Sequence, residues 1–215
     1  MTIEPIAYFH SPVSGKFGLP RQAGIVNKLK GSIQLNSAYA REEALRGLEG
    51  FDIIWLIWGF NLNENKSTSL TVRPPRLGGN ERVGVFASRS PFRPNSLGLS
   101  SVHIEKIEPA RGIIHVSGAD LADGTPIYDI KPYVSYSDAH PDAKCGFVDQ
   151  KHWTELEVEF NHDLELNQDD LEALKGILAQ DPRPQYHNDS SKVYALSFKG
   201  LDVKFQVKEG KVIVL

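Results

Sequence analysis

The pattern of apolar and polar residues predicts short strands separated by turns over the first 150 residues. Apolar side chains at alternate positions are typical of a strand with one buried face. The segment 51–60 reads FDIIWLIWGF with little alternation, which predicts a central strand buried on both faces. Turns rather than long helices join these segments, which favours an antiparallel, mixed or barrel-like sheet over a doubly wound one. We expect strands over 3–9, 32–35, 51–60, 83–87, 97–107, 113–117 and 127–130, and a helix over 39–48.

The last 65 residues have a different pattern, a helix packed on a small antiparallel sheet. Asn167 can cap a helix whose Leu171, Leu174 and Leu178 form an apolar stripe. Residues 139–151 are poor in apolar side chains and are typical of a linker, so we place a domain boundary near residue 150. The expected domains are 1–150 and 151–215, and the expected strands of the second are 153–160, 194–198, 203–207 and 212–214.

Composition predicts a soluble cytoplasmic protein. The chain has 215 residues, a formal net charge of −3 and a single cysteine, Cys145, which excludes an internal disulfide framework and indicates a reducing compartment. The N-terminus shows no signal-peptide pattern. The longest apolar run, residues 53–60, is far shorter than the ~20 residues that span a bilayer, so we expect no membrane association.

Arginine is concentrated in the segment 73–100, where five arginines accompany one acid, Glu81. Guanidinium groups bind carboxylates and phosphates through paired hydrogen bonds, and the prolines nearby stiffen the loops. The segment therefore predicts an anion site on both sides of a short buried strand at 83–87. A solvated loop with surface ion pairs is the alternative. The five arginines are Arg73, Arg76, Arg82, Arg89 and Arg93.

Common catalytic and nucleotide-binding motifs do not occur in this sequence. The seven histidines lack metal-ligand spacing, and neither G-x-S-x-G, G-x-G-x-x-G nor a Walker A motif is present. We therefore expect no metal and no Rossmann fold. The carboxylates Asp120, Asp123 and Asp129 have three interpretations: turn formation, a Mg²⁺ site, or contacts to a ligand's hydroxyls or cationic centre. Spacing does not choose among the three.

Three segments together resemble the TrmO family of S-adenosylmethionine-dependent tRNA methyltransferases. They read VRPPRLGGNERVGVFASRSPFRPNSLGLS, DLADGTPIYDIKPY and AQDPRPQY, in that order along the chain. The resemblance implies methylation of N6 of threonylcarbamoyladenosine, the modified base 3′ of the anticodon. It also implies an N-terminal β-barrel that binds the cofactor without a Rossmann fold, and a homodimer. Ser96 replaces a proline of the family pattern, which should loosen that turn.

The resemblance also implies the site residues. Arg89 would pair with the cofactor's carboxylate, and Asp120 or Asp123 would accept hydrogen bonds from its ribose or amine. The residues expected to bind S-adenosylmethionine are Ala23, Gly24, Ile25, Asn61, Leu62, Arg89, Leu99, Asp120, Leu121, Ala122 and Asp123. The residues expected to bind tRNA are Arg73, Arg76 and Arg93. From proximity in sequence rather than from the resemblance, we expect Asp129, Lys131 or Tyr133 to help remove the acceptor's proton, and the geometry must decide among them.

Two other functions stay open. A non-catalytic module that binds S-adenosylmethionine or RNA would use the same arginines but would show no turnover. A metal-dependent hydrolase would use Asp120, Asp123 and Asp129 together, and a chelator would abolish its activity.

Overall fold

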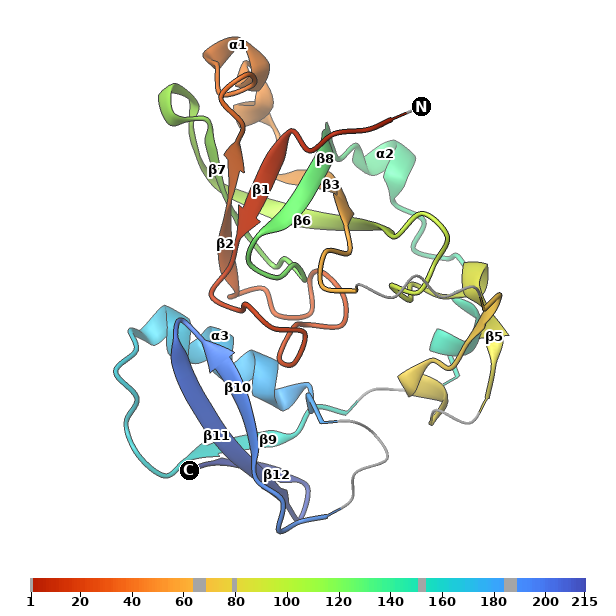
Figure 1. Cartoon of the computed structure of the whole chain (residues 1–215), viewed down its shortest axis with the longest axis vertical. Helices are drawn as coiled ribbons and strands as arrows, with labels where there is room; N and C mark the ends of the chain where they lie inside the picture. The colour runs from red at the N-terminus through yellow and green to blue at the C-terminus, as the bar shows by residue number, and fades with distance from the viewer. Residues whose placement is uncertain (1, 64–68, 79–80, 151–153, 184–188) are drawn as a thin grey trace.

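The computed structural model of this chain describes residues 2–63, 69–78, 81–150, 154–183 and 189–215. Within these ranges, six strands close into a barrel in the order β1-β2-β7-β6-β3-β8, and every neighbouring pair is antiparallel (Figure 1). The mainly β architecture with an N-terminal barrel is therefore confirmed. The barrel strands are β1 (Ala7–His10), β2 (Lys30–Leu35), β3 (Ile53–Gly59), β6 (Leu97–Glu108), β7 (Ile113–Ser117) and β8 (Thr125–Pro132).

The prediction that β3 is buried on both faces is wrong. Ile54, Leu56 and Trp58 point into the barrel and are buried, whereas the intervening side chains are partly exposed. A barrel wall has one face toward the core and one away from it, so even a continuous apolar run alternates in burial. The apolar side chains on the outer face of β3 are therefore free to contact something other than the barrel core.

The buried strand predicted at 83–87 is also wrong. Only β5 (Val83–Gly84) is extended, pairing with β4 (Thr71–Val72), and a 3₁₀ turn η3 (Val85–Ala87) follows. Val85 is buried, but Phe86 is 78% exposed. This segment is a surface excursion from the barrel rather than part of its wall.

The other irregular elements are short. The helix predicted over 39–48 is reduced to α1 (Glu42–Leu45) and the turn η1 (Leu48–Gly50), and Gly47 between them has φ 86°. A left-handed residue cannot continue a helix, which explains the interruption. The remaining short elements are η2 (Pro75–Leu77), η4 (Pro109–Arg111), α2 (Ser135–Asp138) and η5 (Gly146–Val148).

The C-terminal residues form a four-stranded sheet covered by one helix, α3 (Gln168–Ala179) (Figure 1). Asn167 caps α3 by accepting from the Asp170 N–H, as predicted, and Leu174 and Leu178 are fully buried. Three strands are antiparallel, but β12 and β9 are parallel, which differs from the expected antiparallel sheet. The strands are β9 (Glu157–Phe160), β10 (Tyr194–Phe198), β11 (Leu201–Lys208) and β12 (Lys211–Val214), and Trp153, the predicted start of β9, lies outside the described residues.

The loop between β1 and β2, residues 11–29, belongs to the C-terminal core although it comes early in the chain. Val13, Val26 and Leu29 are buried in the same apolar cluster as α3 and the C-terminal sheet. Phe17 stacks on Phe205, with ring centroids 6.2 Å apart. In Figure 1 this loop lies between the barrel and α3. The 11–29 loop therefore joins the two parts of the molecule.

Candidate functional site

A cavity of about 530 Å³ opens where the 11–29 loop meets the barrel; we call it the main cavity. Its walls come from the 11–29 loop, the end of β3 and the loop that follows it, the loop before β6, and the segment between β7 and β8. Trp58 and Phe60 form an apolar wall, with ring centroids 4.4 Å apart in an edge-to-face arrangement. This volume is in the range of small-molecule sites.

A hydrogen-bonded chain runs from the barrel interior to the main cavity. The Trp58 indole N–H donates to Ser100 Oγ at 3.0 Å, and Ser100 donates to Asp120 Oδ1 at 2.6 Å. Ser100 is buried and Asp120 lines the cavity. Burial raises the pKa of the Asp120 carboxyl above its usual range, while hydrogen bonds from Ser100 and from the Ala23 backbone, with the charge of Arg89, act in the opposite direction. The site thus presents one partly desolvated, oriented carboxyl to a ligand.

Two arginines from the predicted anion segment reach the same cavity. Arg89 is exposed, and its Nη1 donates to Gln22 Oε1 at 2.5 Å. Arg93 is half-buried and donates to the Ser88 carbonyl at 3.0 Å. Both guanidinium groups therefore lie at the cavity wall with donors left over, since a guanidinium carries five N–H groups.

The C-terminal part of the chain holds one wall of the main cavity in place. Arg21, which lines the cavity, donates to the Asp181 carbonyl at 3.2 Å. The Asp181 carboxylate in turn accepts from Arg183 Nε and Nη2 at 2.7 and 2.8 Å, a bidentate pair that is largely buried. Asp181 and Arg183 belong to the AQDPRPQY segment, whose residues 184–186 lie outside the described part of the structure.

Six of the eleven residues predicted to bind the cofactor line the main cavity. Asn61 is held there by hydrogen bonds with Gly124 and Thr125, at 3.3 and 3.2 Å. The six residues are Asn61, Leu62, Arg89, Leu99, Asp120 and Ala122.

The other five predicted cofactor residues are not brought to the cavity wall. Leu121 points into the barrel core and is 1% exposed, and Asp123 accepts from the Ser11 N–H at 3.0 Å on another side of the loop. Gly24 donates its N–H to the Gly118 carbonyl at 2.8 Å, and Ala23 and Ile25 flank it. Of these five, Ala23 is tied to the site through its backbone hydrogen bond to Asp120.

The predicted tRNA-binding arginines are dispersed. Arg93 lines the main cavity, whereas Arg73 is exposed on the excursion that carries β4 and β5. Arg76 falls in η2, and its side chain lies outside the described part of the structure.

Ser96, the departure from the family pattern, adopts φ 49° and donates its N–H to the Arg93 carbonyl at 3.2 Å, a bond that proline cannot make.

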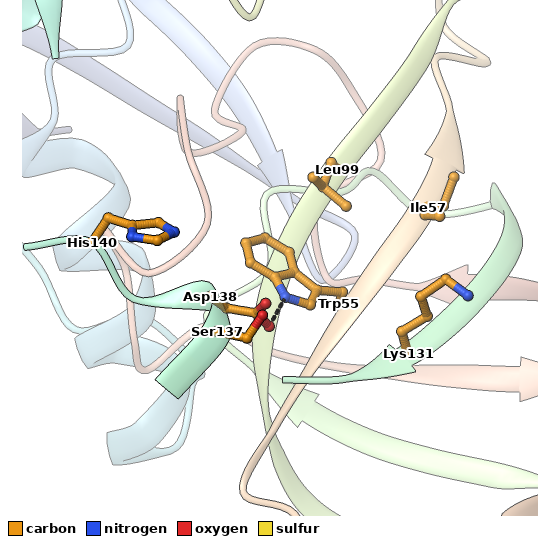
Figure 2. Close-up of a pocket in the computed structure, with 7 residues that line it drawn as sticks. All are labelled: Trp55, Ile57, Leu99, Lys131, Ser137, Asp138 and His140. Atoms are coloured by element: carbon orange, nitrogen blue, oxygen red, sulfur yellow. Dashed lines mark hydrogen bonds between the residues drawn. The ribbon is translucent and has the colours of Figure 1, made fainter. Parts of the chain in front are cut away.

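Of the three residues predicted to remove a proton, Asp129 and Lys131 lie on the outer face of β8 and Tyr133 directly follows its end; none of the three lines the main cavity. Lys131 Nζ is 3.0 Å from Asp129 Oδ2, and the Tyr133 ring packs against Trp55 with centroids 5.8 Å apart. Lys131, Trp55 and Leu99 line a shallow groove beside the main cavity (Figure 2). Trp55 and Leu99 line both.

The carboxylates Asp120, Asp123 and Asp129 do not converge. The first faces the main cavity, the second pairs with His10 and Ser11, and the third pairs with Lys131. Among the residues that the structure describes, His, Cys, Asp and Glu form no group of three that could hold a metal ion. The shared metal site of the hydrolase alternative is therefore not formed by these three side chains.

The sequence does not predict those site residues whose position depends on which strands are neighbours in the barrel. Ser100, Trp58 and Trp55 were expected only as parts of strands, and Arg21 and Gln22 as parts of a turn-rich loop. One signal was present: Gly98 pairs with Trp58, and a Cβ at Gly98 would lie 2.3 Å from the indole. A glycine facing a large ring marks a place where the ring lies flat over the backbone.

Comparison with known proteins gives matches over nearly the whole chain. Residues 8–139 match the family described as tRNA-methyltransferase O N-terminal domain, and residues 153–215 match the TrmO C-terminal domain. The tRNA (adenine(37)-N6)-methyltransferase of Escherichia coli K12 is 37% identical over 218 residues, which cover 96% of this chain and 93% of that protein. A putative S-adenosylmethionine-dependent methyltransferase of Pseudomonas aeruginosa PAO1, RcsF, is 39% identical over 211 residues, covering 94% and 90%.

Solved structures agree with these matches. A crystal structure of TrmO superimposes with a TM-score of 0.82 at 32% identity, covering 100% of this chain and 97% of that chain. A crystal structure of TrmO from Pseudomonas aeruginosa gives 0.80 at 31% identity, covering 100% and 96%. Within the described residues, the structure contains no helix that is both long and apolar enough to cross a membrane.

Proposed function

The chain belongs to the TrmO family, and from that premise we propose that it is an S-adenosylmethionine-dependent tRNA methyltransferase acting on N6 of the adenine at position 37. The finer part of the proposal is the acceptor, threonylcarbamoyladenosine, as the family resemblance implies. One observation carries the proposal: a chain that matches both TrmO domains has a cavity of small-molecule size with an oriented carboxyl and two guanidinium groups.

The residues of the main cavity fit the chemical groups of S-adenosylmethionine. The Asp120 carboxyl suits a ribose hydroxyl or the amino group, and Arg89 suits the carboxylate. Trp58 and Phe60 offer apolar surface to the adenosyl group. When bound, the cofactor supplies an electrophilic methyl group on a sulfonium, and the transfer is an in-line displacement in which positioning contributes much of the rate. The Trp58–Ser100–Asp120 chain fixes the carboxyl before the ligand arrives.

The acceptor nitrogen must lose a proton, and we assign the removal of this proton to Asp129, Lys131 or Tyr133. Asp129 accepts from Lys131 and from the Ile130 N–H at 3.0 Å, which orients its carboxylate. Tyr133 lies beside Trp55, next to the groove that Lys131 lines. Lys131 lines the groove, and Asp129 and Tyr133 contact residues that line it, so each of the three is a candidate for the base.

Binding of tRNA is assigned to arginines around the cavity. Arg93 lies at the cavity wall and Arg73 on the neighbouring excursion, and the proposal adds Arg76 from the same segment. Phosphate contacts of this kind position RNA and make its affinity dependent on salt. A homodimer, a cytoplasmic location and a domain boundary near residue 150 complete the proposal, the last supported by family matches that end at residue 139 and resume at 153.

The test is transfer of labelled methyl from S-adenosylmethionine to tRNA, with a chelator present. We expect label in the tRNA, and loss of transfer in Asp120→Ala. Binding of the cofactor without transfer to any tRNA would favour the non-catalytic module instead. Activity that a chelator abolishes would favour the hydrolase.

A further inference from the structure

The outer face of the barrel has an apolar groove beside the main cavity; we call it the Trp55 groove (Figure 2). Its volume is about 390 Å³. Strand register builds its floor: on β3, Ile57 lies opposite Leu99 of β6, and Trp55 lies opposite Lys131 of β8. Leu99 is 57% exposed, an unusual position for a large apolar side chain on a barrel wall.

The indole of Trp55 is held in one orientation. Its Nε1–H donates to Asp138 Oδ2 at 2.8 Å (Figure 2). The same oxygen accepts the Val134 N–H at 3.0 Å. These two hydrogen bonds, the backbone one first, hold the pKa of the Asp138 carboxyl below its usual range. The Tyr133 ring supports the indole from the side. Because the polar edge of the ring is already bonded and the ring is fixed, a planar ligand can stack on it with little further loss of side-chain entropy.

The groove borders the main cavity and has a charged rim. Trp55 and Leu99 line both spaces, so a group bound in the groove lies next to whatever the main cavity holds. Lys131 and His140 line the groove, as does Ser137. A flat apolar floor with donors at its edge suits a nucleobase, whose face is apolar and whose edges accept hydrogen bonds. Its volume of about 390 Å³ is in the range of small-molecule sites and is large enough for one base.

We propose that the Trp55 groove is the subsite for the acceptor nucleobase, which stacks on the Trp55 indole with Lys131 facing its anionic substituent or the adjoining phosphate. This inference rests on the proposed function, because it takes the acceptor to be a base of single-stranded RNA. It explains why an outward-facing tryptophan on a barrel strand is anchored by a carboxylate 83 residues away along the chain. It also places the acceptor beside Asp129, Lys131 and Tyr133 rather than in the barrel interior.

The experiment uses the full chain and an anticodon stem-loop RNA with 2-aminopurine in place of the acceptor adenine. Trp55→Leu keeps an apolar side chain but removes stacking, and Trp55→Phe keeps an aromatic ring. We expect the fluorescence of the 2-aminopurine to fall on binding to the wild type, and the RNA Kd of Trp55→Leu to rise roughly 5- to 100-fold, the range of one base–aromatic stack. Trp55→Phe should recover part of both signals. Tyr8→Leu is the matched control, since Tyr8 is an exposed ring on β1, two strands from Trp55 in the barrel order.

Three results would overturn the proposal. An unchanged RNA Kd and unchanged quenching in a folded Trp55→Leu variant would show that the base lies elsewhere. A large loss of S-adenosylmethionine affinity in that variant, with the RNA Kd unchanged, would show that Trp55 contacts the cofactor and not the base. A change in sedimentation together with RNA affinity would indicate that a second copy of the chain covers the groove. Because the RNA assay needs no methyl transfer, quenching by an enzyme without transferase activity would refute the proposed function but leave the subsite intact.

Discussion

Replacing Ser100 with alanine should destabilise the protein, and more so at neutral than at acidic pH. Ser100 is 2% exposed and links the Trp58 indole at 3.0 Å to the Asp120 carboxyl at 2.6 Å. Its loss leaves a buried indole N–H without this partner, at a cost of about 1–3 kcal/mol. It also removes a hydrogen bond to a carboxylate, whose net value is about 1.5–3 kcal/mol when the group is ionised. Because coupled terms do not simply add, we expect the free energy of unfolding to fall by about 2–4 kcal/mol at pH 7.

The pH dependence follows from the pKa of Asp120. Burial raises this pKa in the folded state, so the contribution of Asp120 to stability is full below the ordinary value of 3.8 and is lost as the pH rises through the folded value. Ser100 opposes that shift, so its removal raises the folded pKa further. The deficit of the variant should therefore grow as the pH rises from about 3 toward 7, whereas the part due to Trp58 stays constant.

Urea unfolding followed by circular dichroism, at pH 7 and near pH 3.5, measures both effects. Ser101→Ala is the matched control, because Ser101 is the next residue of β6 and lies opposite Trp55 on the outer face; its effect should stay within about 0.5 kcal/mol. A Ser100→Ala variant as stable as Ser101→Ala would show that the hydrogen bonds of Ser100 do not stabilise the fold. An equal deficit at the two pH values would refute the part that concerns Asp120.

Two further predictions concern the walls of the main cavity. Arg89→Ala should weaken S-adenosylmethionine binding by roughly 10- to 100-fold in calorimetry, because it removes a charge-assisted contact. Arg93→Ala should instead weaken tRNA binding and reduce by about one the slope of log affinity against log salt concentration. The opposite pattern of defects would reverse the two assignments. Arg21→Ala should also weaken cofactor binding, because it removes the hydrogen bond between this wall of the main cavity and Asp181. The melting temperature should fall by only a few degrees. An unchanged affinity for the cofactor would show that the C-terminal part of the chain does not support the site.

Much of the fold could be predicted because local patterns reflect local burial. The alternating residues of β10, β11 and β12 are buried on one face as the sequence predicts, and the Asn167 cap forms. The pattern failed for β3 because an apolar run gives no sign of whether its outer face is covered. It failed for 83–87 because two extended residues precede a 3₁₀ turn, and such short segments carry too few alternating positions to be distinguished.

The site was only partly predictable because proximity there depends on strand order and on contacts remote in sequence. The family resemblance supplied Asp120 and Arg89, but a contiguous motif such as DLAD sends successive side chains in different directions, and Leu121 enters the core instead. Ser100 reaches Trp58 only because β6 lies beside β3 in the barrel. The contact of Arg21 with Asp181 spans 160 residues, which no local pattern reveals.

The most direct test of the proposed function is nucleoside analysis by mass spectrometry after incubation with S-adenosylmethionine and a chelator. The substrates are one tRNA with and without the threonylcarbamoyl group on its adenine 37. We expect a single added methyl on N6 of the threonylcarbamoylated adenine, and none on the unmodified tRNA. Equal methylation of both tRNAs, or methylation at another nucleoside, would contradict the acceptor, and no methylation while the cofactor binds would contradict the transferase itself.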